Sequence, residues 1–359
     1  MHPHMTTQEA TRVTRRGKVV VAVGGVLALA VGAYFLLGGR GVKDIPLVGD
    51  ALDPTPVTCP LSGLEPSKES VLDRPAVAVK IENTSIAYPL KGLDDAEIVY
   101  EELVEGGITR FLAMYHCTDA KLAGPIRSAR LVDPAIMTPT TYILAFSGAN
   151  DFVFSRLTDA GIVQIEENAA GEAMQRVETG DAFEHTLFAN TAAVRKLGQK
   201  TYNEPPPSDV YKFGDLPEGK FKKANEITLT FSGGTVVSYK FDTGKYYRYQ
   251  GGEPFMSDSG DQIAVDNVLL ELHTVNLSGP TDVVGTAGTE IADVTGSGKA
   301  VLFRDGVAIK GHWVRAAIED PVRFETEAGE AMILKAGTTW IALLPNDKGE
   351  AKGSFSFAK

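Results

Sequence analysis

The stretch "AEIVYEELVEGGITRFLAMYHC", residues 96–117, decides the fold expected for this chain. Two runs rich in β-branched and aromatic residues flank the paired glycines Gly106 and Gly107, a pattern typical of two antiparallel strands joined by a tight turn. The stretch therefore predicts a central hairpin, although charged side chains interrupt its apolar strands. These charged residues are Glu101, Glu102, Glu105 and Arg110.

A two-residue turn at the glycines would determine which of these side chains share a face. It pairs Glu105 with Ile108 and Leu103 with Arg110, and the period of two then places Arg110 beside both Glu101 and Glu105. A guanidinium between two carboxylates is satisfied by bidentate hydrogen bonds. The arrangement fits a structural ion-pair network, and it also fits a site wall in which Glu101 and Glu105 act as acid and base.

A second polar cluster follows in "GPIRSARLVDP", residues 124–134. It begins with a Gly-Pro turn and offers Ser128 as a helix N-cap between Arg127 and Arg130. Two guanidiniums beside the free N–H groups of a helix start make an anion or polyol site. A solvated helix face paired with Asp133 is the alternative.

Two further residues are candidates for the same site. Ser147, in "YILAFSGA" (142–149), ends a predicted strand, where sites on α/β sheets gather. His185, in "FEHTLF" (183–188), is either a base or a capped loop histidine.

The pattern of elements divides the exported part into two predicted domains. Strand and helix patterns alternate over residues 74–203, which predicts an α/β domain with a mixed sheet. Within this domain, Asn150 is the expected N-cap of a helix in "NDFVFSRLTDAG". A proline-rich interruption follows. Residues 220–346 carry hairpin signals at Gly233-Gly234 and Asp305-Gly306 and scarcely any helical period, which predicts a mostly-β C-terminal domain.

An uncharged apolar run, residues 19–37, precedes these domains. Its length is close to the roughly 20 residues needed to cross a bilayer as a helix, so it predicts a single transmembrane anchor. The denser basic cluster in residues 1–18 favours a cytoplasmic N-terminus, with residues 38–73 as an extracytoplasmic linker. A cleavable signal peptide, cut near Ala33, is the alternative.

Cysteine use and charge fit an extracytoplasmic location. Cys59 and Cys117 are the only thiols, and an even pair in an oxidising compartment predicts a disulfide. Beyond Lys43, 29 basic and 45 acidic residues remain, which makes nucleic acid an unfavourable partner. The sequence holds no nucleophile elbow, P-loop or zinc-protease motif, so neither a cofactor nor a metal is predicted.

The chain resembles the YerB-like lipoproteins, a two-domain envelope family. The resemblance rests on "RPAVAVKIEN", "AEIVYEELVEGGITRFLAMY", "GPIRSARLVD" and the late stretch "VLFRDGVAIKGHW", and it implies an α/β domain followed by a β-rich one. The lipid-modified cysteine of such proteins is absent, so the apolar run would supply the anchor. The family pattern maps onto Glu101, Glu105, Gly106, Thr109, Arg110, Arg127, Ser128 and Arg130.

We therefore expect a single-pass cell-membrane protein whose extracytoplasmic α/β domain binds an anionic or polyhydroxylated ligand, such as a cell-wall glycan. A glycan or ester hydrolase with Glu101 and Glu105 as its acid–base pair is the first alternative. A non-catalytic scaffold that binds an envelope protein is the second. The predicted ligand-binding residues are Thr109, Arg110, Arg127, Ser128, Arg130, Ser147 and His185.

Overall fold

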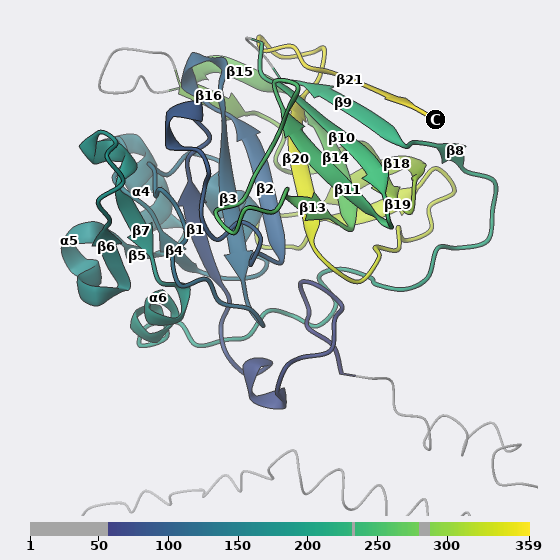
Figure 1. Ribbon diagram of the computed structural model, residues 1–359. Helices are drawn as coiled ribbons and strands as arrows, with labels where there is room; N and C mark the ends of the chain where they lie inside the picture. The colour runs from purple at the N-terminus through teal and green to yellow at the C-terminus, as the bar shows by residue number, and fades with distance from the viewer. Residues whose placement is uncertain (1–56, 232–233, 280–287) are drawn as a thin grey trace, which may run out of the picture. The chain divides into compact units, whose positions relative to one another are not determined.

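One mixed sheet built from both halves of the sequence forms the centre of the protein (Figure 1). The computed structural model describes residues 57–231, 234–279 and 288–359. Across the sheet the strands are β19 (Arg323–Thr326), β18 (Val307–Arg315), β17 (Gly296–Arg304), β14 (Asn267–His273), β20 (Thr339–Pro345), β2 (Ile98–Leu103), β3 (Thr109–Tyr115), β1 (Val77–Ile81), β4 (Ile143–Ala145) and β5 (Val163–Ile165), with β8 (Lys222–Lys223) beside β18.

The predicted halves meet inside this sheet. β2 pairs in parallel with β20, so that Glu101 lies opposite Ala342, and β20 pairs in parallel with β14. Residues Thr58–Lys359 form one compact unit. The predicted mixed sheet and the mostly-β second half are confirmed, and the sheet runs without a break from one half into the other.

A second, antiparallel sheet covers one face of the central sheet. The hydrophobic core between them includes Phe111 and Trp340 of the central sheet, whose rings are 5.0 Å apart, and Tyr239 and Tyr246 of the second. Its strands are β12 (Glu253–Pro254), β11 (Lys245–Gln250), β10 (Val236–Asp242), β9 (Glu226–Thr230) and β21 (Ser354–Ala358), with β13 (Ala264–Val265) beside β11. Two small ladders join β15 (Val275–Gly279) to β16 (Gly288–Ile291) and β6 (Met174–Arg176) to β7 (Leu187–Ala189).

Short helices flank the strands of the first half. Asn150 caps the second of them by accepting a hydrogen bond from the N–H of Val153, as expected, but the first begins at Asp133 rather than after Ser128. The predicted N-cap role of Ser128 is therefore wrong. The α-helices are α3 (Asp133–Met137), α4 (Asp151–Asp159), α5 (Glu167–Ala170) and α6 (Thr191–Gly198). The 3-10 turns are η2 (Glu69–Val71), η3 (Ser85–Ala87), η4 (Glu105–Gly107), η5 (Gly171–Ala173) and η6 (Phe183–His185).

The predicted disulfide is confirmed. Cys59 and Cys117 are bonded, with their Cα atoms 6.1 Å apart and a sequence separation of 58. Beside the bond, the buried Glu97 carboxylate accepts the N–H groups of His116 and Cys117 at 2.6 and 2.8 Å. The bridge thus attaches the start of the described chain to the end of β3.

The predicted membrane span, residues 19–37, lies outside the residues that the structure describes. Within the described residues, no helix has the length and apolar character required for crossing a bilayer.

Candidate functional site

The carboxyl ends of six parallel strands meet at one edge of the central sheet (Figure 1). These strands are β1, β2, β4, β5, β14 and β20. Ligands of open α/β sheets bind outside such ends, where loops rather than strand partners surround the polar groups. Ser147 follows β4, and Thr109 and Arg110 begin β3 at this edge. Arg127, Ser128 and Arg130 come after β3 in the sequence, and backbone hydrogen bonds bring their segment to the same edge.

A short segment, residues 126–129, runs between the ends of β1 and β4. The N–H of Arg127 donates to the carbonyl of Lys80, and the N–H of Ser147 donates to the carbonyl of Arg127, both at 2.9 Å. The N–H of Ala129 likewise donates to Gly148 at 3.1 Å. These bonds bring Arg127, Ser128 and Ser147 together, although about twenty residues of sequence separate them.

The hairpin register differs from the prediction by one residue. Glu102 lies opposite Arg110 and Leu103 opposite Thr109, whereas the two-residue turn required Leu103 opposite Arg110. The connection is the three-residue turn η4, in which Gly106 and Gly107 both have positive φ and the N–H of Val104 donates to Ile108. A slip of one residue exchanges the faces of a strand, so the predicted position of Arg110 between Glu101 and Glu105 is wrong.

Glu101 lies on the opposite face, sealed between the two sheets. Its carboxylate accepts hydrogen bonds from Arg248 at 3.0 Å, Trp340 at 2.8 Å and Thr109 at 2.7 Å. The side chains of Glu101 and Arg248 are both fully buried. The structure therefore places Glu101 and Thr109 away from the other predicted residues and separates Glu101 from Glu105.

Arginines gather on the face that carries Glu102. Arg110 and Arg130 each donate from Nη1 to the carbonyl of Ser128 at 3.0 Å, and Arg130 forms a two-pronged pair with Glu105, with its Nε 2.9 Å from Oε2. Burial, followed by the neighbouring charge of Arg130, lowers the pKa of Arg110 to about 9. The buried Nε of Arg110 has no hydrogen-bond partner among the described residues.

Lys80 is the buried centre of this arrangement. Its ammonium group donates to Asp133 at 2.6 Å and forms an ion pair with Glu102, and all three side chains are almost completely buried. Burial raises the pKa of Glu102 to about 7 against the opposing effect of Lys80. Asp133 also accepts the N–H of Arg130 at 2.6 Å, so the start of α3 is tied to the arginine segment.

Glu82, at the end of β1, connects His185 to the same cluster. The His185 Nδ1 lies 2.8 Å from the carboxylate of Glu82, and Arg127 Nε donates to that carboxylate at 3.1 Å. An Nδ1 that donates to Glu82 has no lone pair for Arg127, so the 3.2 Å approach of Arg127 Nη2 to it is a contact rather than a hydrogen bond. His185 and Arg127 therefore lie side by side, as expected for residues of one site.

The cluster opens to solvent through its arginines. The Arg127 side chain is 25% exposed and that of Arg130 is 14% exposed, whereas Glu82 and Lys80 lie beneath them at 1% and 0%. Ser128 and Ser147 are also partly exposed. We call this set the edge cluster: Lys80, Glu82, Glu102, Glu105, Arg110, Arg127, Ser128, Arg130, Asp133, Ser147 and His185.

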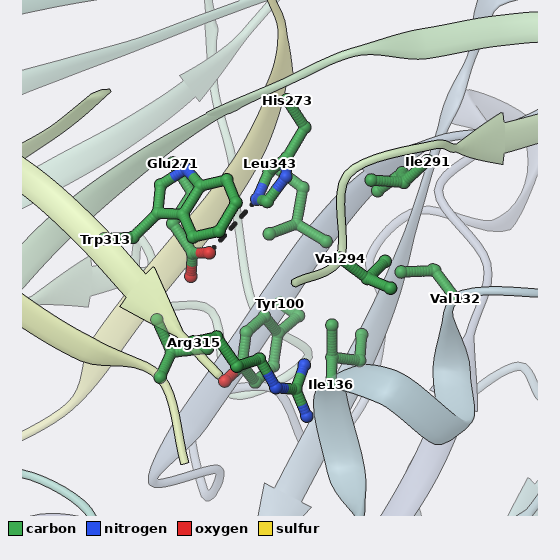
Figure 2. Close-up of a pocket in the computed structure, with 11 residues that line it drawn as sticks. Tyr100, Val132, Ile136, Glu271, His273, Ile291, Val294, Trp313, Arg315 and Leu343 are labelled. Atoms are coloured by element: carbon green, nitrogen blue, oxygen red, sulfur yellow. Dashed lines mark hydrogen bonds and ion pairs between the residues drawn. The ribbon is translucent and has the colours of Figure 1, made fainter. Parts of the chain in front are cut away.

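A second buried polar group lies on the same face of the sheet, between α3 and the C-terminal strands (Figure 2). His273 contacts Glu271 at 3.1 Å and Asp293 at 3.2 Å, and its ring stacks on Trp313 at 4.6 Å. Burial alone would lower the pKa of His273, but the two carboxylates raise it to about 9. The adjoining cavity of about 10 Å³ has room for about one water molecule, so this group is a packed interior rather than a ligand pocket.

Comparison with known proteins agrees with the fold and the resemblance. The profile "Protein of unknown function (DUF3048) N-terminal domain" matches residues 61–204, and the profile of the C-terminal domain of the same family matches residues 227–341. The chain belongs to the DUF3048 family. "Putative lipoprotein YerB" of Bacillus subtilis (strain 168) is 26% identical over 336 residues, which cover 87% of this chain and 92% of that protein.

The solved crystal structure of the YerB protein from Bacillus subtilis shows the same fold. It superposes with a TM-score of 0.68 at 24% identity and covers 83% of this chain and 99% of the YerB chain. An experimentally solved relative of this DUF3048 protein therefore shares its overall fold.

Several members of the edge cluster were missed by the sequence reasoning on this DUF3048 chain. They are Lys80, Glu82, Glu102 and Asp133. Lys80 carried a usable signal, because a lysine inside the apolar strand "AVAVKI" must be paired when it is buried. Asp133 was considered as a surface partner of the arginines, and its contact with Lys80 spans 53 residues of sequence.

Proposed function

We propose that this protein binds an anionic, polyhydroxylated ligand, such as a cell-wall glycan, at the edge cluster. The observation that carries the proposal is the gathering of Arg110, Arg127 and Arg130 at the carboxyl edge of the sheet, where the Arg127 side chain is a quarter exposed. Guanidinium groups bind carboxylates and phosphates through directional, paired hydrogen bonds. An otherwise acidic protein thus presents cations at the place where ligands of α/β sheets bind.

The charge balance of the cluster favours an anion. Four cationic side chains face four carboxyl groups, but the raised pKa of Glu102 leaves this carboxyl partly protonated at neutral pH. Positive charge is then in excess. The cations are Lys80, Arg110, Arg127 and Arg130, and the carboxyl groups are Glu82, Glu102, Glu105 and Asp133.

The same edge offers groups for hydroxyl recognition. The hydroxyls of Ser128 and Ser147 lie on neighbouring segments and are both donors and acceptors. The first turn of α4 begins at Asp151, close after Ser147. Guanidinium, hydroxyl and backbone groups together suit a ligand that carries both a negative charge and hydroxyls.

The expected extracytoplasmic location supports a cell-wall ligand. The relative YerB is named as a lipoprotein, and a disulfide such as Cys59–Cys117 persists in oxidising compartments. Both cysteines of this chain are in that disulfide, so neither is available for a lipid. We infer that residues 19–37 anchor the protein in the cell membrane and that the folded part lies outside.

The positions of Glu101 and Glu105 do not favour the hydrolase alternative, which requires them to act as an acid–base pair. Glu101 is sealed between the two sheets, and Glu105 lies in the turn beside Arg130 on the other face. Two carboxyl groups that act on one glycosidic bond must face the same sugar. The scaffold alternative remains as an outcome of the binding test.

The test is the substitution Arg127→Ala, measured by isothermal titration calorimetry with a purified muropeptide. We expect binding to weaken by more than tenfold, because a charged hydrogen-bond donor is lost, with little change in melting temperature because Arg127 is partly exposed. The matched control is Arg323→Ala, which removes an arginine that is 69% exposed on β19. Equal affinity in all three proteins would refute the site, and a wild-type protein that binds no muropeptide would favour the scaffold.

A further inference from the structure

An exposed aromatic ring lies in the same turn as His185 of the edge cluster. Phe183, in the turn η6, is 69% exposed, whereas most large apolar side chains of the described residues are buried. Single exposed apolar residues are common on protein surfaces, so exposure by itself assigns nothing. What distinguishes Phe183 is the way in which its neighbours hold it.

Arg176 fixes the ring from one side. The guanidinium carbon lies 3.3 Å from the centre of the Phe183 ring, and the same guanidinium forms two hydrogen bonds of 2.6 Å to the carboxylate of Glu167. Arg176 also donates to the backbone carbonyl of Phe183 and to the Thr186 hydroxyl. Because one face of the ring is covered, its large exposed area belongs to the rim and the other face.

The turn that carries Phe183 also supplies His185 to the edge cluster. His185 is 7% exposed and points inward to Glu82 and Arg127, while Phe183 points outward. With a rise of about 2 Å per residue in a 3-10 turn, the two side chains leave the backbone only about 4 Å apart along its axis. The backbone of Phe183 is therefore close to the edge cluster through His185, whose Nδ1 lies 3.2 Å from Arg127 Nη2.

We propose that Phe183 is the stacking platform for a sugar ring whose acidic group is bound by Arg127. This inference rests on the function proposed above and adds a residue that selects the class of ligand. The C–H face of a pyranose carries partial positive charge and packs on the electron-rich face of an aromatic ring, and the neighbouring guanidinium meets the carboxylate of an acidic sugar.

The surroundings of the ring favour a sugar over an acyl chain. A lipid tail requires a contiguous apolar surface, whereas the groups around Phe183 are Glu167, Arg176 and Thr186. Charged and hydroxyl groups at the rim of the ring suit the hydroxyls of a glycan. An immobilised phenyl group also loses little conformational entropy when a ligand stacks on it.

The experiment compares two probes on three variants of the full chain by titration calorimetry. The probes are a purified N-acetylglucosaminyl-N-acetylmuramyl muropeptide and citrate, an anion without a sugar ring. We expect Phe183→Ala to weaken muropeptide binding about tenfold and to leave citrate binding unchanged. Arg127→Ala should weaken both, and Phe183→Trp should restore muropeptide binding.

A matched control removes an exposed apolar side chain elsewhere. Leu64 is 50% exposed and lies next to the disulfide, at the opposite edge of the sheet, so Leu64→Ala should leave both affinities unchanged. If the wild type binds the muropeptide and Phe183→Ala binds it equally well, the stacking role is wrong while the proposed function stands. If the wild type binds no muropeptide, the proposed function and this inference both fail.

Discussion

Two neighbouring residues of β2 lead to two very different charged networks. Glu101 points to one face of the sheet and pairs with Arg248, and Glu102 points to the other and pairs with Lys80. In the first network both partners are fully buried between two sheets. In the second, the exposed fraction of the side chain rises from 0% at Lys80 to 25% at Arg127. Charge alone therefore does not mark a site, since only the second network is connected to solvent.

The sealed network, the ion pair of Glu101 with Arg248, joins the two sheets, and we call it the joint. The Arg248 guanidinium lies 4.1 Å from the ring centre of Phe255, 4.8 Å from Trp340 and 5.3 Å from Phe111. Burial alone lowers the pKa of Arg248, but the carboxylate of Glu101 more than compensates and raises it. Cation–π contacts and one ion pair thus attach the second sheet to the central sheet.

The largest predicted effect concerns this joint. Glu101→Leu should lower the free energy of unfolding by about 3–5 kcal/mol, because Arg248 is left as an unpaired charge in a dry interior. The double variant Glu101→Leu/Arg248→Met should recover most of the loss, since two apolar side chains replace a desolvated ion pair. Urea denaturation followed by fluorescence measures both values.

An exposed ion pair provides the comparison for the joint. Arg323 and Glu325 lie 3.6 Å apart on β19 and are 69% and 34% exposed, so Glu325→Ala should change the stability little. If Glu101→Leu is as harmless as Glu325→Ala, the pair does not join the sheets. Muropeptide binding by the stable double variant would further show that Glu101 is dispensable for the site.

The second prediction uses the raised pKa of Glu102. A carboxyl group whose pKa is about 7 when folded and near 4.3 when unfolded favours the folded state fully below pH 4.3 and loses this contribution as the pH rises to about 7. The wild type should therefore lose up to about 3 kcal/mol relative to Glu102→Gln across this window. Denaturant unfolding of both proteins at pH 4.5, 6 and 8 measures the difference.

The difference between the two proteins isolates Glu102 from other groups that titrate in this range. Glu97, which is also buried and has a raised pKa, is present in both proteins and cancels. A constant difference from pH 4.5 to 8 would show that Lys80 keeps Glu102 ionised throughout. The charge excess of the edge cluster would then be smaller than proposed.

Local signals in the sequence predicted helix caps and turns better than they predicted which side chains contact one another. The Asn150 cap and the two-residue turn at Asp305-Gly306 follow from residues within a few positions, and both are confirmed. The two-residue turn predicted at Gly106-Gly107 is wrong, because two glycines with positive φ suit a three-residue turn as well as a two-residue turn.

The partners in the candidate site depend on contacts that no local pattern contains. Arg248 reaches Glu101 across 147 residues, and His185 reaches Glu82 across 103. Arg127 and Ser128 were predicted as part of a helix start, but the structure begins that helix at Asp133. Ser147 was predicted because sites gather at the ends of parallel strands, a rule that survives an error in register. The predicted face of Arg110 is wrong, because a register shift of one residue places a side chain on the opposite face of the sheet.

The smallest predicted effect tests whether Glu105 competes with the ligand for Arg130 or positions Arg130 for it. Its carboxylate neutralises Arg130 in a pair whose side chains are only 11% and 14% exposed. Glu105→Gln keeps the shape and one hydrogen-bond acceptor but removes the negative charge, so stability should fall by about 1 kcal/mol. Muropeptide affinity should rise about threefold, because Arg130 becomes available to an anionic ligand and the repulsion disappears. A fall in affinity would instead mean that the charge of Glu105 positions Arg130, and the edge cluster would then bind through Arg127 alone.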